Sequence, residues 1–576
     1  MGRYRLGIDI GGTFTDFSLF DRAAGTLTGL KVPSTPPEFA EGVRHGLTRL
    51  VGEHGIEPRE ITTVVHGTTI AVNTVIQRTG ARLGLLTTEG FRDLLEIQRL
   101  RLPNPFDLNS RRPIPLIGRA RVAEVRERIL VDGSVDTPLD EASVEAAVNR
   151  LQGLGVDGLV VAFLHAYRNP AHEQRAKAIA ARLAPGLPVS ASAEVWPQAR
   201  EYERATLAIM DAYVQPKVRR YLEGFQAVLA AHGVPAVPYI TKSNGGIMPV
   251  DAAARRTVGT LLSGPASGVI GAAYVAGQAG IRNLITLDVG GTSADIAIVE
   301  DGRPRYSTSE HIGDFPVITP VVGVSSIGAG GGSVAWVDEV GVPKVGPQST
   351  GSNPGPACYG LGGKDATLTD AFLVSGFLDP EHFLGGRMRL DRGLAEEALG
   401  RLADATGLSL TEAAESVVRV AASTMYAEST KIMSKNAVDP REFALVAFGG
   451  AGPLVGCLIA REVGIPLVFV PRAPGTLCAL GAITTDILND AVRTVHLRVH
   501  GVDLGALGRQ YEALRAEHLT WLDEHALTPE ATAFRYSADM RYVGQSYEIE
   551  VEVDPAWLGP GGDIGLLGSF HRGHER

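Results

Sequence analysis

The chain has 576 residues, which predicts about three or four domains and excludes a small disulfide-stapled scaffold. Lysine and arginine total 54 against 64 aspartate and glutamate, a net charge of −10, so we expect no surface for nucleic acid or an anionic membrane. Hydrophobic residues at 44% and charged residues at 20% are typical of a folded globular protein. The expected partner is therefore a small molecule or another protein.

The sequence predicts a cytoplasmic protein. We expect no signal peptide and no membrane span, because the chain has neither a basic stretch with a cleavage site nor a sufficiently long apolar run. The three cysteines, Cys358, Cys457 and Cys478, form no CxxC pair and are interpreted as small buried hydrophobic residues. An odd cysteine count without pairing suits a reducing compartment.

The first predicted element is a β-hairpin, because apolar residues alternate over residues 5–21 around a Gly-Gly-Thr turn. The same pattern returns over residues 285–299. Each copy has an aspartate between two apolar residues, then Gly-Gly-Thr, then a second aspartate three positions after the threonine. The repeat predicts a duplicated fold with one such turn in each half.

Elsewhere, predicted strands alternate with predicted helices, which indicates an α/β fold. Strands are expected at residues 64–66, 83–87, 158–164 and 443–448. Helices are expected at residues 68–78, 91–98, 141–151, 199–231 and 411–434. From residue 495 the pattern changes to a helix at 506–525 and β-like sequence at 534–553. We therefore predict domains at 1–200, 201–492 and 493–576, the last a small α+β domain.

An aspartate at a strand end beside a Gly-Gly-Thr turn predicts a site for a metal–phosphate unit. Backbone N–H groups and the threonine hydroxyl can cradle phosphate oxygens, and the aspartate can hold Mg²⁺ through its water ligands. A single turn of this kind also occurs for purely conformational reasons. Two turns in matching registers predict that they face each other and grip one polyphosphate from both sides.

The two copies resemble the phosphate-1 and phosphate-2 motifs of the actin, sugar-kinase and heat-shock-chaperone ATPase superfamily. That superfamily also carries a glycine-rich adenosine motif in its second lobe, and residues 446–454 are similar to it. The resemblance implies an α/β fold with duplicated ribonuclease-H-like (actin-like ATPase) lobes around a nucleotide cleft. The sequence has neither a Walker A loop nor a Rossmann fingerprint.

Further motifs resemble the hydantoinase A/5-oxoprolinase family and extend over about residues 6–490. They lie at residues 7–16, 66–73, 87–97, 243–246, 262–269, 327–333 and 353–360. The resemblance implies an ATP-dependent hydrolase subunit that phosphorylates and opens a cyclic amide, such as a hydantoin, N-methylhydantoin, 5-oxoproline or a lactam. It implies ATP and Mg²⁺ as cofactors, a monovalent cation such as K⁺ as a further candidate, and a hydantoinase B-type partner subunit.

The resemblance and the motif chemistry together give the candidate site residues. The catalytic candidates are Asp9, His66 and Asp288, and the two aspartates are also the candidate Mg²⁺ ligands, through water. The nucleotide and phosphate candidates are Gly11, Gly12, Thr13, Asp16, Gly290, Gly291, Thr292, Asp295, Gly328, Gly330, Gly331, Gly449, Gly450 and Gly452. The substrate candidates are Thr68, Thr69, Asn73, Asn244 and Gly245.

Several assignments keep a structural alternative. Asp16 and Asp295 either orient the turns and the metal-bound waters or have a merely structural role. His66 either polarises the substrate and moves a proton near neutral pH, or is a core histidine with both ring nitrogens satisfied. Asn244 is equally suited to a tight turn, because Asn-Gly-Gly is a common turn signal.

Two departures from the family pattern are evident. Val455 stands where many relatives have a histidine, so any role of that histidine is absent here. Relatives usually continue past the point matching residues 570–576, and the chain is expected to be either truncated or naturally short.

Two other functions stay open from the sequence. One is the ATP-dependent phosphorylating subunit of a ketone carboxylase, acting on acetone or acetophenone. The other, of a different class, is a non-catalytic actin-like nucleotide-switch protein, whose ATP turnover would be indifferent to cyclic amides.

Overall fold

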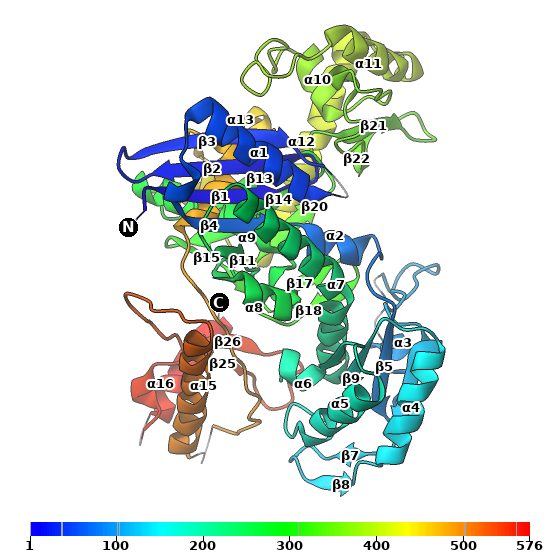
Figure 1. Cartoon of the computed structure of the whole chain (residues 1–576). Helices are drawn as coiled ribbons and strands as arrows, with labels where there is room; N and C mark the ends of the chain where they lie inside the picture. The colour runs from blue at the N-terminus through cyan, green and yellow to red at the C-terminus, as the bar shows by residue number, and fades with distance from the viewer. Residues whose placement is uncertain are drawn as a thin grey trace. The chain divides into compact units, whose positions relative to one another are not determined.

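The computed structural model describes residues 2–35, 38–100, 102, 104–308, 310–499, 503–559 and 562–575. The chain forms two compact units (Figure 1). The first unit comprises Met1–Gly80 and Val214–Leu488, and the second comprises Ala81–Tyr213 and Asn489–Arg576. This division differs from the predicted domains 1–200, 201–492 and 493–576, because the chain leaves the first unit after residue 80 and re-enters it at residue 214.

The first sheet of the first unit contains the first copy of the repeated hairpin. Its strands, in spatial order, are β12 (Ile247–Pro249), β11 (Pro238–Thr241), β4 (Ile61–Thr68), β1 (Tyr4–Ile10), β2 (Phe14–Asp21) and β3 (Thr26–Pro33). Strand β1 pairs antiparallel with β2 and parallel with β4. Leu6, Ile8 and Ile10, which project from one face of β1, are fully buried, so that face lies against the core.

The second sheet repeats this connectivity around the second hairpin. Its strands, in spatial order, are β15 (Arg303–Pro304), β14 (Ala294–Glu300), β13 (Leu284–Val289), β23 (Ala444–Gly449) and β24 (Leu467–Phe469), with β20 (Val324–Ile327) also paired to β14. Strand β13 pairs antiparallel with β14 and parallel with β23. The duplicated ribonuclease-H-like fold predicted from the sequence is therefore confirmed.

The following helices lie wholly within the first unit. They are α1 (Phe39–His54), α2 (Ile70–Ile76), α8 (Val250–Arg255), α9 (Ser263–Gln278), α10 (Leu368–Val374), α11 (Arg392–Thr406), α12 (Leu410–Lys435), α13 (Gly452–Val463) and α14 (Leu477–Thr484). The long helix α7 (Glu201–Ala231) begins in the second unit and continues into the first. Its extent matches the helix predicted over residues 199–231.

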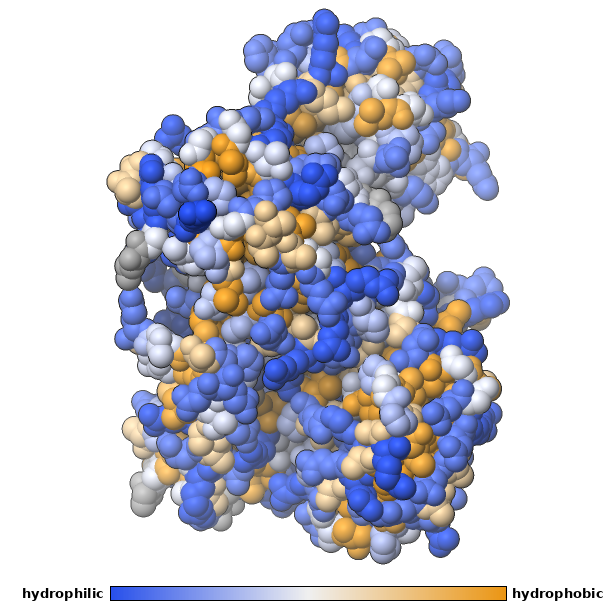
Figure 2. Space-filling model, in the orientation of Figure 1, coloured by the Kyte–Doolittle hydropathy of each residue, from blue (hydrophilic) through white to orange (hydrophobic). Residues whose placement is uncertain are grey.

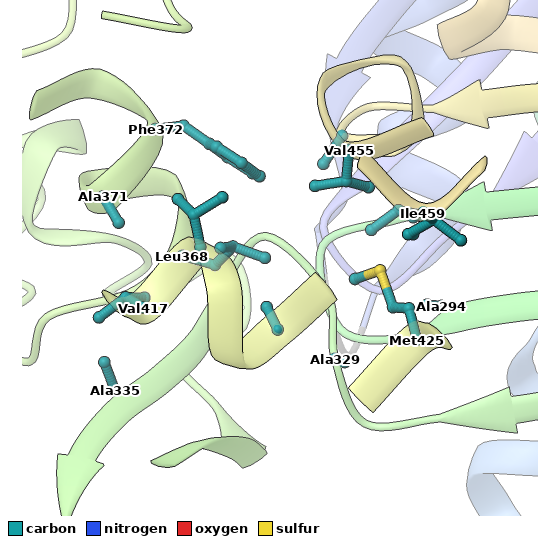
Figure 3. Close-up of a cluster of buried hydrophobic side chains, with 14 of the residues drawn as sticks. Ala294, Ala329, Ala335, Leu368, Ala371, Phe372, Val417, Met425, Val455 and Ile459 are labelled. Carbon is teal, nitrogen blue, oxygen red and sulfur yellow. The ribbon is translucent and has the colours of Figure 1, made fainter. Parts of the chain in front are cut away.

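Helix α13 buries one face and exposes the other. Val455 and Ile459 lie one turn apart and join Met425 of α12 in the core of the second sheet (Figure 3). Val455 is fully buried, so the position where many relatives have a histidine is a core position in this chain. Cys457 lies on the other face and is exposed, which corrects the expectation that it is buried.

Helix α14 packs against its neighbours with backbone in contact with backbone. A Cβ atom added at Gly481 of α14 would lie 1.9 Å from the carbonyl oxygen of Ser267 in α9. A Cβ atom added at Gly7 of β1 would lie 1.8 Å from the carbonyl oxygen of Ala479. Only glycine permits these approaches, which hold α14 against the strand that carries Asp9.

The second unit contains a four-stranded parallel sheet. In spatial order its strands are β10 (Val189–Ala191), β9 (Gly158–Ala162), β5 (Leu83–Thr88) and β6 (Val122–Val125). Its helices include α4 (Glu141–Gly153), α5 (Ala171–Leu183) and α6 (Ser192–Val195). The helix predicted over residues 91–98 is a single turn, α3 (Leu94–Ile97), because Gln98 adopts a left-handed φ of 55° and ends it.

The C-terminal segment belongs to the second unit. Its elements are α15 (Leu504–Glu524), β25 (Ser537–Met540), β26 (Ile549–Glu552) and α16 (Asp563–Glu575). Arg200 forms an ion pair with Glu548, and the Ala199 N–H donates to Thr494 Oγ1 at 3.0 Å. These contacts join it to residues that the sequence assigned to another domain.

Within the described ranges, no helix is both long and apolar enough for a bilayer span. Hydrophilic residues predominate on the face shown in Figure 2, with hydrophobic residues interspersed among them.

Candidate active site

Two aspartates stand opposite each other in each hairpin. Asp9 of β1 pairs with Asp16 of β2, and Asp288 of β13 pairs with Asp295 of β14. Directly opposed residues of antiparallel strands project from the same face of a sheet. The equivalent register in both sheets therefore gives each lobe a pair of neighbouring carboxylates.

A third strand extends each pair into a row, and the two rows end differently. Lys31 of β3 stands opposite Asp16, and its Nζ lies 2.6 Å from Asp16 Oδ1. Ser326 of β20 stands opposite Asp295, and its hydroxyl donates to that carboxylate. We call Asp9, Asp16 and Lys31 the first row, and Asp288, Asp295 and Ser326 the second row.

The two Gly-Gly-Thr turns have the same closure and lie against each other. The Gly11 N–H donates to the Phe14 carbonyl oxygen at 2.9 Å, and the Gly290 N–H donates to the Ser293 carbonyl oxygen at 3.0 Å. A Cβ atom added at Gly291 would lie 2.4 Å from Thr13 Oγ1. The structure thus brings a turn from each lobe to one place.

Glycines on the neighbouring parallel strands leave space for the first aspartate of each row. A Cβ atom at Gly67 of β4 would lie 2.6 Å from Asp9 Oδ1. A Cβ atom at Gly449 of β23 would lie 2.3 Å from Asp288 Oδ1, and Gly449 also has a φ of 81°. A side chain at either position would displace the carboxylate.

Burial of these carboxylates makes ionisation costly in the ligand-free protein. Burial raises the pKa of Asp9 to about 7, with the charge of Asp16 adding to the rise and Lys31 opposing it. Burial likewise raises the pKa of Asp288 to about 7, with the charge of Asp295 adding to the rise. Such shifts are frequent where a binding site is built to receive a cation.

The residues present fit a magnesium–nucleotide complex. Asp9 Oδ1 and Thr13 Oγ1 are buried, and neither has a hydrogen-bond partner among the described residues. Mg²⁺ suits such a site, because it keeps several waters and is held by few carboxylates together with substrate phosphates.

The two other glycine-rich loops support the second turn. The Gly331 N–H donates to the Gly290 carbonyl oxygen at 2.9 Å, and a Cβ atom at Gly330 would lie 2.5 Å from the Thr292 nitrogen. The Ala451 N–H donates to the Val289 carbonyl oxygen at 2.9 Å. The loops at 328–332 and 449–452 therefore lie beside the second row; direct nucleotide contacts by their glycines stay a prediction.

His66 is a fully buried histidine with both ring nitrogens occupied. Because a carbonyl oxygen accepts, Nδ1–H donates to the Ile8 carbonyl oxygen at 3.2 Å, and Nε2 accepts from the Tyr221 hydroxyl at 2.7 Å. The Phe225 ring packs against it with a centroid separation of 4.6 Å. This geometry supports the structural alternative, in which His66 positions the strand that carries Asp9.

The burial of His66 predicts acid sensitivity of the first sheet. Burial lowers the pKa of His66 to about 4 from its ordinary 6.5. Between pH 6.5 and pH 4, His66 is protonated in the unfolded chain but neutral in the folded protein. The free energy of unfolding therefore keeps its full value above pH 6.5 and falls on acidification by up to about 1.4 kcal/mol per pH unit. Urea unfolding at pH 7 and pH 5 should show a smaller loss for His66→Gln than for the wild type. An equal loss in both proteins would contradict this account.

The substrate candidates divide into two groups. Thr69 Oγ1 donates to the Ile10 carbonyl oxygen at 3.2 Å and accepts from Asn73 Nδ2 at 3.4 Å, and Thr68 Oγ1 accepts from the Ile70 N–H at 3.2 Å. These residues lie where β4 ends and α2 begins, beside the strand that carries Asp9.

Asn244 and Gly245 belong to the turn between β11 and β12. Asn244 Oδ1 accepts from the Gly246 N–H at 3.0 Å, and Gly245 has a φ of 80°. These contacts support the turn alternative, and a substrate role for either residue stays a prediction.

Three residues of the site were missed by sequence analysis: Lys31, Ser326 and Cys478. Lys31 was not singled out, because its place in the first row depends on the pairing of β2 with β3. Cys478 of α14 was interpreted only as a hydrophobic residue, but its thiol donates to Asp288 Oδ2 at 3.2 Å. Burial and the nearby carboxylate raise the pKa of this thiol well above its ordinary value, so it stays protonated as a donor.

Comparisons with known proteins agree with the geometry. The model of the hydantoinase/oxoprolinase N-terminal region matches residues 5–184, and the hydantoinase/oxoprolinase model matches residues 204–491. Caprolactamase subunit alpha of Pseudomonas jessenii is 36% identical over 100% of this chain and 84% of its own length. The acetophenone carboxylase gamma subunit of Aromatoleum aromaticum is 35% identical over 84% of this chain and 68% of its own length.

Solved structures extend the likeness to the whole fold. The crystal structure of ATP-dependent caprolactamase from Pseudomonas jessenii has a TM-score of 0.87 and 36% identity, over 99% of this chain and 84% of that chain. A nucleotide-free acetone carboxylase structure has a TM-score of 0.83 and 26% identity, over 100% of this chain and 85% of that chain. The chain belongs to the hydantoinase/oxoprolinase family.

Proposed function

We propose that this chain is the ATP-dependent subunit of a hydrolase that opens a cyclic amide, with a lactam as the first substrate to test. The observation that carries the proposal is the contact between the two Gly-Gly-Thr turns, each flanked by a row with two half-buried aspartates. The similarity to caprolactamase subunit alpha, which extends over the whole chain, supports a lactam in particular.

The acidic rows require the nucleotide to arrive with a cation. Asp9, Asp16, Asp288 and Asp295 would repel a bare polyphosphate, whereas Asp9 and Asp288 would hold Mg²⁺ through its waters. The metal supplies neutralisation of phosphate charge. The turn N–H groups and the hydroxyls of Thr13 and Thr292 orient the phosphates for in-line transfer.

Phosphoryl transfer overcomes the low reactivity of an amide. The amide carbonyl oxygen attacks the γ-phosphorus, the bond from that phosphorus to the bridging oxygen of ADP breaks, and an imidate phosphate forms. Water then attacks the former carbonyl carbon and the ring C–N bond breaks, which frees the amine and leaves an acyl phosphate. A second water attacks the carbonyl carbon of the acyl phosphate, and phosphate leaves with the original carbonyl oxygen. The chain's contribution is positioning and charge stabilisation.

We infer that the enzyme has a second subunit of the hydantoinase B type. Relatives of this chain are named as subunits, among them caprolactamase subunit alpha and the acetophenone carboxylase gamma subunit. A requirement for K⁺ is a further part of the proposal and is tested by replacing K⁺ with Na⁺ in the assay.

A substrate panel tests the proposal. ATP hydrolysis by the chain with its partner subunit is measured with caprolactam, 5-oxoproline, hydantoin, N-methylhydantoin, acetone and acetophenone. We expect stimulation by a ring amide and formation of the ring-opened product. Stimulation only by a ketone together with bicarbonate would assign the chain to the carboxylases, which the 35% identical acetophenone carboxylase subunit makes the second candidate. Turnover indifferent to every compound would favour the nucleotide-switch alternative.

A further inference from the structure

The two aspartate rows differ at one position, although the sheets that carry them repeat the same connectivity. The strand beyond the second aspartate contributes Lys31 to the first row and Ser326 to the second. The first row therefore carries an ammonium group where the second carries a neutral hydroxyl. If both rows served only to stabilise their hairpins, the same residue type could occupy this position in each row.

The ammonium of Lys31 is held in place with one donor to spare. Its Nζ lies 2.6 Å from Asp16 Oδ1 and donates to the Gly475 carbonyl oxygen at 2.7 Å. An ammonium group has three N–H donors, so these two oxygen acceptors leave one N–H without an acceptor among the described residues, and the centroid of the Phe14 ring lies 5.5 Å from Nζ. The side chain is 21% exposed, so part of it is accessible to a bound molecule.

The predicted adenosine motif, residues 446–454, lies on the side of the second row. Gly449 is adjacent to the Asp288 carboxylate, and the Ala451 N–H donates to the Val289 carbonyl oxygen at 2.9 Å. A nucleotide whose adenosine occupies this motif would extend its phosphates from the second turn to the first. The terminal phosphate is then the one that comes nearest to the first row.

We propose that Lys31 binds the γ-phosphate of ATP through its third N–H and so distinguishes ATP from ADP. This inference rests on the proposed nucleotide site. Asp16 and the Gly475 carbonyl oxygen act as positioning groups, because they fix the ammonium before the nucleotide arrives. After transfer, the ammonium stabilises the phosphoryl group on its acceptor oxygen.

The test is the binding of two nucleotides, measured by titration calorimetry with Mg²⁺ present. MgADP is compared with the magnesium complex of the β,γ-imido analogue of ATP. In Lys31→Met, affinity for the triphosphate analogue should fall by about tenfold to 100-fold, while affinity for MgADP stays within about twofold. Lys31→Arg keeps the charge and should recover most of the loss.

Lys344→Met is the matched control, because Lys344 forms an exposed ion pair with Asp338 at 3.5 Å and its loss should change neither affinity. Equal weakening of both nucleotides in Lys31→Met, or weakening of neither, would overturn the inference while leaving the proposed function intact. Failure of the wild-type chain to bind either nucleotide would overturn the proposed function and this inference with it.

Discussion

Asp9→Asn and Asp288→Asn are each expected to reduce ATP turnover by about 100-fold or more while making the ligand-free protein more stable at pH 8. The loss of turnover follows because an amide cannot supply the negative charge that holds the hydrated metal ion. The gain in stability follows from burial, which raises the pKa of both carboxyl groups to about 7.

The sign of the stability change depends on pH. A carboxyl group whose pKa is raised on folding does not destabilise the fold at a pH below its unfolded pKa of about 3.8. The destabilisation grows as the pH rises from that value to the folded pKa of about 7, and it is complete above it. Each substitution should therefore stabilise the protein by about 1–3 kcal/mol at pH 8 and by much less at pH 5.

Thermal melting at the two pH values, together with ATP turnover, checks both halves of this prediction. The exposed Asp404→Asn is the control, and it should change neither turnover nor melting temperature. Near-normal turnover in both site variants would contradict the assignment of the two aspartates. Destabilisation at pH 8 would contradict the account of their burial.

Gly481→Ala is expected to destabilise the first unit strongly, although it adds only one methyl group. A Cβ atom at Gly481 would lie 1.9 Å from the Ser267 carbonyl oxygen, a backbone atom that cannot rotate away as a flexible side chain could. Helix α14 would have to move, at a cost of about 3 kcal/mol. Because α14 also carries Cys478, this movement would displace the donor to Asp288 and reduce ATP turnover as well.

Gly277→Ala is the matched control for this prediction. Gly277 lies near the end of α9, and a Cβ atom there would have no atom within 4 Å. Replacing a helical glycine in open space should stabilise the protein by about 0.5–1 kcal/mol. Urea unfolding of the two variants compares them directly, and equal stabilities would contradict the close packing of α14.

The parts of the site that sequence analysis could predict are those encoded locally. A Gly-Gly-Thr turn between alternating apolar strands specifies its own hairpin, so Asp9 and Asp288 could be singled out from spacing alone. The repeat of that pattern then indicated the duplicated fold. Long helices such as α7 were predicted because their apolar spacing extends over many turns.

The parts that could not be predicted depend on contacts between distant segments. Lys31 joins the first row only because β3 pairs with β2, and Cys478 reaches Asp288 only because α14 packs against α9. The hydrogen bond from Tyr221 to His66 joins residues 155 positions apart, and no local sequence pattern indicates it. The grouping of residues 489–576 with 81–213 is non-local in the same way.

The central claim, phosphoryl transfer to the amide oxygen, is tested most directly by following that oxygen. A lactam labelled with ¹⁸O in its carbonyl group is opened by the complete enzyme with unlabelled ATP and water. The account predicts that the label leaves in inorganic phosphate, one labelled oxygen for each ring opened. Retention of the label in the new carboxylate, with unlabelled phosphate, would show that the amide oxygen does not leave the carbon with phosphorus and would contradict the account.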